Sequence, residues 1–511
     1  MVDGTLAPPA GSGRGWRGGR PRRTIHASDG ATGGPSRHRP SDARRRAPRA
    51  GVRRRNSGAP VRPSSIAARL AAAALLAPAV LATPVAAQAP AAGGATAARA
   101  DAAVAGVMPK VIAWRRDIHQ HPELSNRETR TAGLVAEHLK KLGLEVRTGV
   151  AKTGVVGVLK GGRPGPTVAL RADMDALPVT EEVDVPFRST VKSTYNGQDV
   201  GVMHACGHDT HVAMLMGAAE VLAGMKAELP GTVVFIFQPA EEGAPPGERG
   251  GASVMIEEGA LDQPKVDAIF GLHVFAKLPT GTLHVKPQGI MASSDNLRIV
   301  VRGRQTHGAL PWQGVDPIVV SAQIVSALQT ITSRQTDVTL APAIVTVGTI
   351  RGGTRFNIVP DSVVMEGTIR TFDERMQKDI HARVARTAEK IAEASGATAA
   401  VTVTIGNPVT FNDPALTERM GPTLQRVAGA GKVSVAQVTT TAEDFALYQK
   451  KVPGMFLFLG ITPPDADLAT VAANHSPRFT VDEAALPTGV KTLVGLAMDY
   501  LAMGKQVGTN R

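Results

Sequence analysis

The 511-residue sequence contains a single cysteine, Cys206. One thiol cannot close a disulfide within its own chain, so the fold does not depend on such a cross-link. Three short motifs are also missing: the HExxH helix, the GxSxG nucleophile turn and the P-loop. The chemistries that these motifs carry therefore have no support.

Most of the chain also lacks an excess of either charge. The net charge is +13, but residues 1–69 hold 16 arginines and three aspartates, which leaves 41 basic and 41 acidic side chains elsewhere. Recognition of nucleic acid has little support in that remainder, and we expect no nucleic-acid partner. Residues 1–60, rich in Gly, Pro, Arg and Ser, predict a disordered leader. The alternatives are an RNA-binding tail or an incorrectly extended N-terminus.

The apolar run within residues 61–87 is a poor membrane span, because it is mostly alanine and contains Pro78 and Pro84. We therefore expect no stable membrane association. Arginines before the run and small residues after it are typical of a secretory signal peptide cleaved after Ala87. This pattern predicts translation from near Val61 and an exported protein, periplasmic or secreted.

From residue 103 the chain alternates helical and strand patterns, which predicts an α/β fold. We expect helices at 103–121, 127–143 and 209–229, and strands at 154–161, 167–178, 231–243 and 265–274. Asp209 or Thr210 is the expected cap of the third helix. Residues 293–407 predict the order β-α-β-β-α-β, that of a ferredoxin-like unit. The expected architecture is a catalytic domain in two parts, 103–292 and 408–507, with residues 293–407 inserted as a lid.

Groups able to bind metal follow several of the predicted strands. In an open α/β sheet the functional groups collect where strands end, so we expect these side chains to meet. A thiolate, imidazoles and carboxylates suit a zinc- or manganese-type site. For any one of these residues alone, a structural role is the alternative. The candidates are Asp173, Asp175, Cys206, His208, Glu241, Glu242, His273 and His475.

The adjacent Glu241 and Glu242 suggest two separate roles. Neighbouring side chains of an extended segment point in opposite directions, so one carboxylate can bind metal while the other acts as a base. A divalent metal lowers the pKa of bound water from about 15.7 toward about 7, and a positioned base adds roughly 10²–10⁴-fold. Together they predict hydrolysis of an amide or ester carbonyl.

Several stretches in this order resemble the N-acyl-amino-acid amidohydrolases: "LRADMDALPVTEE", "MHACGHDTHVAMLMGAA", "QPAEEG", "GLHV", "GRQTHGALPWQGVDPI", "FNIVPD", "EGTIRTF", "AEDFA" and "HSPRF". That family includes hippurate hydrolases and plant hydrolases of indole-acetyl-amino-acid conjugates, within the aminoacylase and carboxypeptidase superfamily. The resemblance runs from about residue 103 to 505.

The resemblance implies a site with two divalent metal ions, Mn²⁺ or Zn²⁺, and Glu241 as the general base. Asp173 would orient a ligand from outside the metal shell. Much of the superfamily has a ligating histidine where this chain has Arg171, which leaves one histidine fewer. The implied metal ligands are Cys206, His208, Glu242, His273 and His475.

The lid would complete this site. By resemblance, His307 would be an oxyanion donor, supplied by the same or a partner subunit of a homodimer formed through the lid. Asn357 and Arg370 would hold the substrate carboxylate. The alternative is that His307 packs at a hinge and Arg370 pairs with a structural carboxylate.

These observations predict a metal-dependent amidohydrolase that cleaves small-molecule N-acyl-amino acids. One alternative is a dipeptidase or carboxypeptidase of the same superfamily. The other is a metal-dependent binding protein that has lost catalysis, which the presence of both glutamates of "QPAEEG" disfavours.

Overall fold

The computed structural model describes residues 91–504, with side chains from residue 95 onward. The predicted leader at 1–60, the predicted signal segment at 61–87 and the last residues of the predicted 408–507 segment lie outside this range. Within residues 91–504, no helix is both long enough and apolar enough to cross a membrane.

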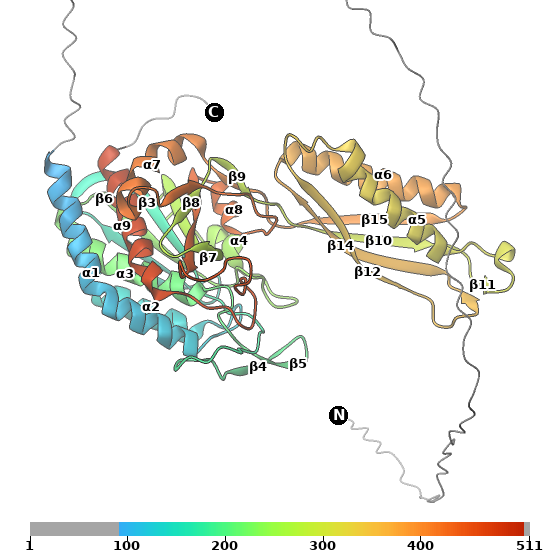
Figure 1. Ribbon diagram of the computed structural model, residues 1–511, viewed down its shortest axis with the longest axis horizontal. Coiled ribbons are helices and arrows are strands. Elements are labelled where there is room, and N and C mark those ends of the chain that lie inside the picture. Colours follow the sequence, from blue (N-terminus) through green and yellow to red (C-terminus); the bar gives the residue numbers. More distant parts are fainter. Residues whose placement is uncertain (1–90, 505–511) are drawn as a thin grey trace, which may run out of the picture. The chain divides into compact units, whose positions relative to one another are not determined.

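Eight strands form one large sheet in the order β1-β2-β6-β3-β7-β18-β8-β17. Figure 1 shows its strands β3, β6, β7 and β8 surrounded by helices. The central strands β6, β3, β7 and β18 run parallel, and β1 and β2 are added antiparallel at one side. This large sheet confirms the predicted α/β fold. The strands are β1 Glu145–Val150, β2 Gly154–Lys160, β3 Arg163–Asp173, β6 Pro230–Gln238, β7 Ala268–Pro279, β8 Leu283–Val285, β17 Val433–Val435 and β18 Gly454–Thr462.

The central strands are apolar on both faces because helices cover both faces. In β6, Phe235 and Phe237 join one hydrophobic cluster while Val234 and Ile236 join another, as expected when successive side chains alternate. The first cluster includes side chains of α1, α2, α3, α7 and α9, and the second those of α4 and α8. These helices are α1 Ala91–Gln120, α2 Thr129–Lys141, α3 His208–Gly224, α4 Gly251–Glu257, α7 Pro414–Ala428, α8 Phe445–Gln449 and α9 Leu486–Met503.

Two predicted helix starts differ from the structure. Helix α1 begins at Ala91 rather than near residue 103. Helix α3 begins at His208 after Gly207, so the expected cap at Asp209 or Thr210 is wrong. Gly207 has a φ of 94°, and a Cβ there would lie 2.4 Å from Val274 Cγ2, so only glycine fits this turn.

Residues 295–405 form a second, four-stranded antiparallel sheet in the order β12-β14-β10-β15. Helices α5 and α6 cover one of its faces (Figure 1), and Asp316 and Asp373 cap their N-termini. Its hydrophobic core is separate from the clusters of the large sheet. The elements are β10 Asp295–Arg302, α5 Pro317–Thr330, β12 Ala343–Gly352, β14 Ser362–Thr371, α6 Glu374–Ala394 and β15 Thr398–Ile405.

Three short strand pairs complete the fold, and the sequence pattern did not indicate them as strand pairs. They are β4 Lys192–Tyr195 with β5 Gln198–Gly201, β9 Gln288–Met291 with β16 Thr410–Asn412, and β11 Thr306–His307 with β13 Ile358–Val359. Single turns of helix lie at Lys226–Glu228, Pro311–Gln313, Ile331–Gln335 and Glu483–Ala485.

Candidate metal centre and active site

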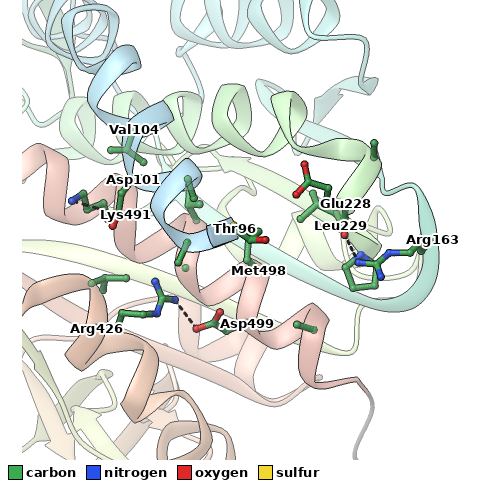
Figure 2. Close-up of a pocket in the computed structure, with 18 residues that line it drawn as sticks. Thr96, Asp101, Val104, Arg163, Glu228, Leu229, Arg426, Lys491, Met498 and Asp499 are labelled. Atoms are coloured by element: carbon green, nitrogen blue, oxygen red, sulfur yellow. Dashed lines mark hydrogen bonds and ion pairs between the residues drawn. The ribbon is translucent and has the colours of Figure 1, made fainter. Parts of the chain in front are cut away.

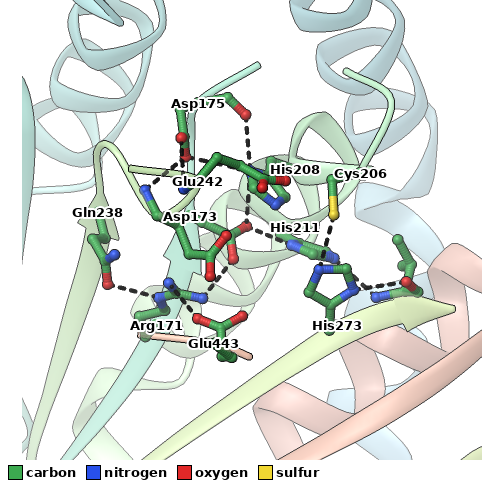
Figure 3. A network of polar contacts seen from close by, with 12 residues as sticks. Arg171, Asp173, Asp175, Cys206, His208, His211, Gln238, Glu242, His273 and Glu443 are labelled. Carbon is green, nitrogen blue, oxygen red and sulfur yellow. Dashed lines mark hydrogen bonds and ion pairs between the residues drawn. The ribbon is translucent and has the colours of Figure 1, made fainter. Parts of the chain in front are cut away.

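Neighbouring parallel strands carry the predicted ligands to one edge of the large sheet. Strand β3 ends at Asp173, β6 ends just before the two glutamates, and β7 carries His273. Cys206 and His208 lie at the start of α3, and His475 lies in the loop after β18. The expected gathering of these groups is present in the structure (Figure 3), but His273 lies within β7, which continues to Pro279 beyond the predicted end at residue 274.

The donor atoms lie at separations that suit a metal site. Cys206 Sγ is 3.3 Å from His273 Nε2 and 3.2 Å from His475 Nε2. The same His475 nitrogen is 3.0 Å from Glu242 Oε1. A sulfur and a nitrogen bound tetrahedrally to one zinc ion would lie roughly 3.5 Å apart, so these contacts resemble the spacing of ligands around an ion.

The five predicted ligands form overlapping groups. The donor atoms of Cys206, His208 and His273 all lie within 4.8 Å of one another, and so do those of Cys206, Glu242 and His475. Cys206 belongs to both groups. The sole thiol therefore lies where two sets of donors meet.

Two of the imidazoles use one ring nitrogen in a hydrogen bond to a backbone carbonyl and leave the other available to a metal. His273 Nδ1 donates a hydrogen bond of 2.7 Å to the carbonyl of Val274, which leaves Nε2 facing the thiol. His208 Nδ1 donates to the carbonyl of Asp175 at 2.8 Å, and its buried Nε2 has no hydrogen-bond partner among the described residues. A neutral imidazole held at one nitrogen and free at the other is the usual form of a metal ligand. The residues present therefore fit a metal.

His211 lies in the same cluster but has no free nitrogen. Its Nδ1 contacts Asp173 Oδ1 at 2.5 Å, and its Nε2 accepts the backbone N–H of Val274 at 2.9 Å. These contacts assign His211 to hydrogen bonding and packing rather than to metal binding. His204 differs, because neither of its ring nitrogens has a hydrogen-bond partner in the part of the chain that the structure describes.

Burial and nearby carboxylates determine the protonation of the metal-free site. Burial, and then the charges of Glu242 and Glu241, raise the pKa of the Cys206 thiol well above its usual value. Burial alone would lower the pKa of His208, but the neighbouring carboxylates, Asp173 first, raise it to about 10. Without metal, Cys206 is thus a neutral thiol and His208 an imidazolium, and metal binding must displace both protons.

Glu241 and Glu242 lie in a turn rather than at the end of an extended strand. Strand β6 ends at Gln238, and Ala240 has a φ of 53°. The expectation that strand alternation separates the two carboxylates is therefore wrong. Instead, both backbone N–H groups donate to the carboxylate of Asp175, at 3.1 and 3.0 Å, which fixes the turn.

The turn nevertheless gives the two carboxylates different neighbours. Both carboxylates group with His208, but only Glu242 also groups with the thiol and His475, and only Glu241 also groups with Glu443 and Asp444. Burial, and then the charges of Glu443, Glu242 and Asp444, raise the pKa of Glu241 well above its usual value. A raised pKa brings a carboxylate closer to the range that suits a general base near neutral pH.

Beneath the cluster, Arg171 is the cation of a buried network (Figure 3). Its guanidinium contacts Asp173 at 2.5 Å, Glu443 at 3.0 Å and Asp444 at 3.1 Å, and it donates to Gln238 at 2.9 Å. Asp173 thus joins Arg171 to His211, while its Oδ1 stays 3.8 Å from His208 Nδ1. Arg171 therefore acts here as a buried countercharge.

Sequence reasoning missed the roles of two residues that organise the site, since it gave Asp175 only as a candidate metal-binding residue and gave Asn474 no role. Asp175 holds the glutamate turn and also accepts a hydrogen bond from the Ser125 hydroxyl at 2.7 Å. Asn474 binds the backbone of Cys206. The sequence signals were only an acidic residue after Asp173 and an amide before His475.

The three predicted substrate-contacting residues lie in the segment of the smaller sheet. His307 is exposed in β11, and its Nδ1 accepts the N–H of Ala309 at 3.0 Å. Asn357 accepts the N–H of Gly308 on its backbone carbonyl at 2.7 Å. Arg370, in β14, is half-buried. Within residues 91–504, none of the three lines the cavity beside the thiol.

A cavity of about 280 Å³ adjoins the candidate ligands, and it has room for a small molecule. The thiol, imidazoles and carboxylates share its lining with apolar side chains such as Phe275, Met291 and Phe458. It is lined by Cys206, Glu241, Glu242, His273, Phe275, Lys277, Met291, Thr441, Ala442, Glu443, Phe458, Ala473, Asn474 and His475.

A larger cavity of about 540 Å³ lies between α1, α7 and α9 (Figure 2). The charged groups that reach it have partners: Arg426 pairs with Asp499 at 2.7 Å, Lys491 with Asp101 at 3.5 Å and Glu228 with Arg99, while Arg163 donates to the carbonyl of Glu228. Among the described residues, none that lines this cavity belongs to a candidate metal-binding group. The smaller cavity is therefore the better candidate for chemistry.

Sequence comparison supports the interpretation of the motifs. Residues 169–499 match the peptidase family M20/M25/M40. The chain is 42% identical to thermostable carboxypeptidase 2 of Saccharolobus solfataricus over 392 residues, covering 76% of this chain and 95% of the relative. It is 40% identical to N-acetyl-L-cysteine deacetylase of Bacillus subtilis, covering 74% of this chain and 85% of that protein.

Structural comparison gives the same answer. A crystal structure of a Bacillus subtilis protein, described as a dinuclear metal-binding peptidase from the M20 family, superposes with a TM-score of 0.66 at 36% identity. The match covers 78% of this chain and 99% of that one. The resemblance expected from the motifs is confirmed: the chain belongs to the peptidase family M20/M25/M40.

Proposed function

We propose that this protein is a metal-dependent amidohydrolase that cleaves the amide bond of N-acyl-amino acids and releases a carboxylic acid and an amino acid. The observation that carries this proposal is the convergence of a thiol, three imidazoles and a carboxylate, with donor atoms in overlapping groups, beside a carboxylate of raised pKa. The deacetylase relative, which is named for removing an acyl group from an amino acid, supports the substrate class.

In this proposal two divalent metal ions, Mn²⁺ or Zn²⁺, bind the residues gathered around the thiol. When bound, such ions polarise a carbonyl and lower the pKa of water. Thiolate ligation favours zinc over harder ions. The ligands are Cys206, His208, Glu242, His273 and His475, the residues of the overlapping groups.

Glu241 acts as the general base. It accepts a proton from the attacking water and delivers it to the nitrogen of the leaving amino acid. It lies next to the proposed ligands His208 and Glu242 but outside both groups that contain the thiol, and it also lies beside Glu443 and Asp444, which suits this role. Asp175 holds both glutamates by their backbone N–H groups, and Asp173 orients the cluster through His211.

We further propose that residues 293–407 are a ferredoxin-like lid through which the protein dimerises. His307 would stabilise the oxyanion, and Asn357 and Arg370 would hold the substrate carboxylate, all from the lid. The order β-α-β-β-α-β between residues 295 and 405 supports this proposal. Export to the periplasm or outside the cell remains our proposal from residues 61–87.

The test is an assay of N-acyl-amino acids with metal-loaded protein, metal-free protein and the Glu241→Gln variant. We expect activity only in the first, restored to the second by Zn²⁺ or Mn²⁺. Glu257→Gln is the matched control, because Glu257 at the end of α4 is an exposed carboxylate that pairs with Arg249. Equal turnover in all samples would contradict the proposal.

A second candidate function is a carboxypeptidase or dipeptidase, which the relatedness to a thermostable carboxypeptidase favours. Rates on an N-acyl-amino acid and on a free dipeptide with the same leaving amino acid distinguish the two. Tight binding of both compounds without turnover would instead indicate a binding protein that has lost catalysis.

A further inference from the structure

The side chain of Asn474 joins two segments of the site. Its Nδ2 donates to the carbonyls of Cys206 and Val274, each at 3.1 Å, and its Oδ1 accepts the N–H of Ala276 at 3.1 Å. One amide thereby fixes the loop of β18 both to the turn before α3 and to strand β7.

The next residue, His475, continues this connection through its backbone. Its N–H donates to the carbonyl of Ala205 at 2.8 Å, so residues 474 and 475 bind residues 206 and 205 in succession. His475 has a φ of 70°, a left-handed conformation that is uncommon for a residue other than glycine. Such a conformation persists only where the surrounding structure fixes it.

Lys277 secures the same loop further upstream. Its ammonium donates to the carbonyls of Leu468, Ala469 and Val471 at 3.0, 3.3 and 2.6 Å. An ammonium has three N–H donors, so each is used on the loop. Although Lys277 lines the cavity, its charge serves the loop rather than a molecule in the cavity.

The imidazole of His475 has little else to hold it in place. Its side chain is 53% exposed, and its described polar contacts are with Cys206 Sγ and Glu242 Oε1. Its position against the thiol must therefore come from the loop.

We propose that Asn474 and Lys277 are positioning residues that hold His475 in the geometry required to share a metal with Cys206. This inference rests on the proposed function, in which His475 is a metal ligand. Contacts of this kind around a metal shell are worth about 10–100-fold in metal affinity.

The chain offers a close control for each residue. Asn412 also donates to two backbone carbonyls, of Lys286 at 2.9 Å and Phe456 at 2.7 Å, and accepts the N–H of Phe456 at 2.7 Å. Lys286 donates to the carbonyl of Gly289 at 2.9 Å. Asn412→Ala and Lys286→Met therefore remove the same kinds of contact without touching the loop of His475.

Two measurements test the proposal on the full chain. The first is zinc affinity by competition with a chelating dye, and the second is the rate at which a thiol reagent labels the metal-free protein. Cys206 is the only cysteine in the sequence, so labelling reports on this site alone. We expect Asn474→Ala and Lys277→Met to weaken zinc binding about 10–100-fold and to speed labelling, and both controls to match the unaltered protein in both measurements.

Unchanged zinc affinity and labelling in Asn474→Ala and Lys277→Met would overturn this inference and leave the amidohydrolase proposal in place. If Asn474→Ala does not fold, the comparison of Lys277→Met with Lys286→Met decides alone, because Lys277 is only half-buried. Equal weakening in the variants and their controls would indicate general loosening of the fold and would also overturn the inference. An unaltered protein that binds neither zinc nor manganese would overturn the proposed function as well.

Discussion

The carboxylate of Asp175 accepts the backbone N–H of Glu242 at 3.0 Å and, with its other oxygen, that of Glu241 at 3.1 Å. Asp175, which follows strand β3, thus fixes the turn that follows the neighbouring strand β6. This turn gives the two adjacent carboxylates partly different neighbours. The sequence predicted that strand alternation would separate them, but strand β6 ends before they are reached.

We predict that Asp175→Asn lowers kcat for N-acyl-amino acids by about 10–100-fold. Asparagine has one acceptor oxygen, and its NH₂ group would face a second N–H donor in the turn. Steady-state kinetics and metal content by elemental analysis provide the measurement. Asp199→Asn, on the exposed β4–β5 hairpin, serves as the control. An Asp175→Asn enzyme with unaltered kcat would show that the turn holds itself.

We predict that Arg171→Met destabilises the protein by about 3–5 kcal/mol, because it leaves buried carboxylates without their countercharge. Asp173, Glu443 and Asp444 all contact the guanidinium. Urea unfolding of the metal-free protein measures the loss.

The exposed pair of Arg249 and Glu257 provides the comparison for that measurement. We expect Arg249→Met to change the free energy of unfolding by less than about 1 kcal/mol. A similar loss in both variants would contradict the view that Arg171 is the essential countercharge of the cluster.

Much of the large sheet could be predicted because burial on both faces leaves continuous apolar runs, as in residues 230–238. The three-residue strands β8 and β17 are too short to show a period, and they exist because strands distant in sequence pair with them. The start of α1 was missed because "AAGGATAARA" has no clear apolar stripe.

The candidate ligands could be predicted because their residue types are unusual and several of them lie at the ends of predicted strands. Their supporting contacts could not, since they depend on which segments meet in space. Asn474 binds the carbonyl of Cys206 across 268 positions of sequence. Likewise, no sequence pattern indicates that Asp209 contacts Arg115 and His119, each at 2.9 Å, instead of capping α3.

We predict that Cys206→Ser impairs zinc binding more than manganese binding. The hydroxyl is a poor replacement for a soft thiolate, which favours zinc, whereas manganese accepts oxygen ligands. We expect zinc affinity to fall by more than the roughly 10–100-fold that loss of an outer contact costs. Dialysis against each metal followed by elemental analysis measures this difference. Equal retention of zinc by Cys206→Ser and the unaltered protein would exclude the thiol as a ligand.

Metal affinity should rise with pH across the neutral range. In the metal-free protein burial raises the pKa of Cys206, and the neighbouring carboxylates raise the pKa of His208 to about 10 despite its burial. Both groups therefore hold a proton at neutral pH that a metal must displace, whereas the pKa of His273 is held well below its usual value by burial, so this residue has none to lose. Below the two raised pKa values, each displaced proton strengthens binding by about tenfold per pH unit, so two protons give up to about a hundredfold. Dye competition at pH 6, 7 and 8, with calorimetry in buffers of different ionisation enthalpy, measures the affinity and the protons released. Affinity that stays constant over this range, with no proton release, would mean that the metal does not bind the thiolate and the His208 imidazole.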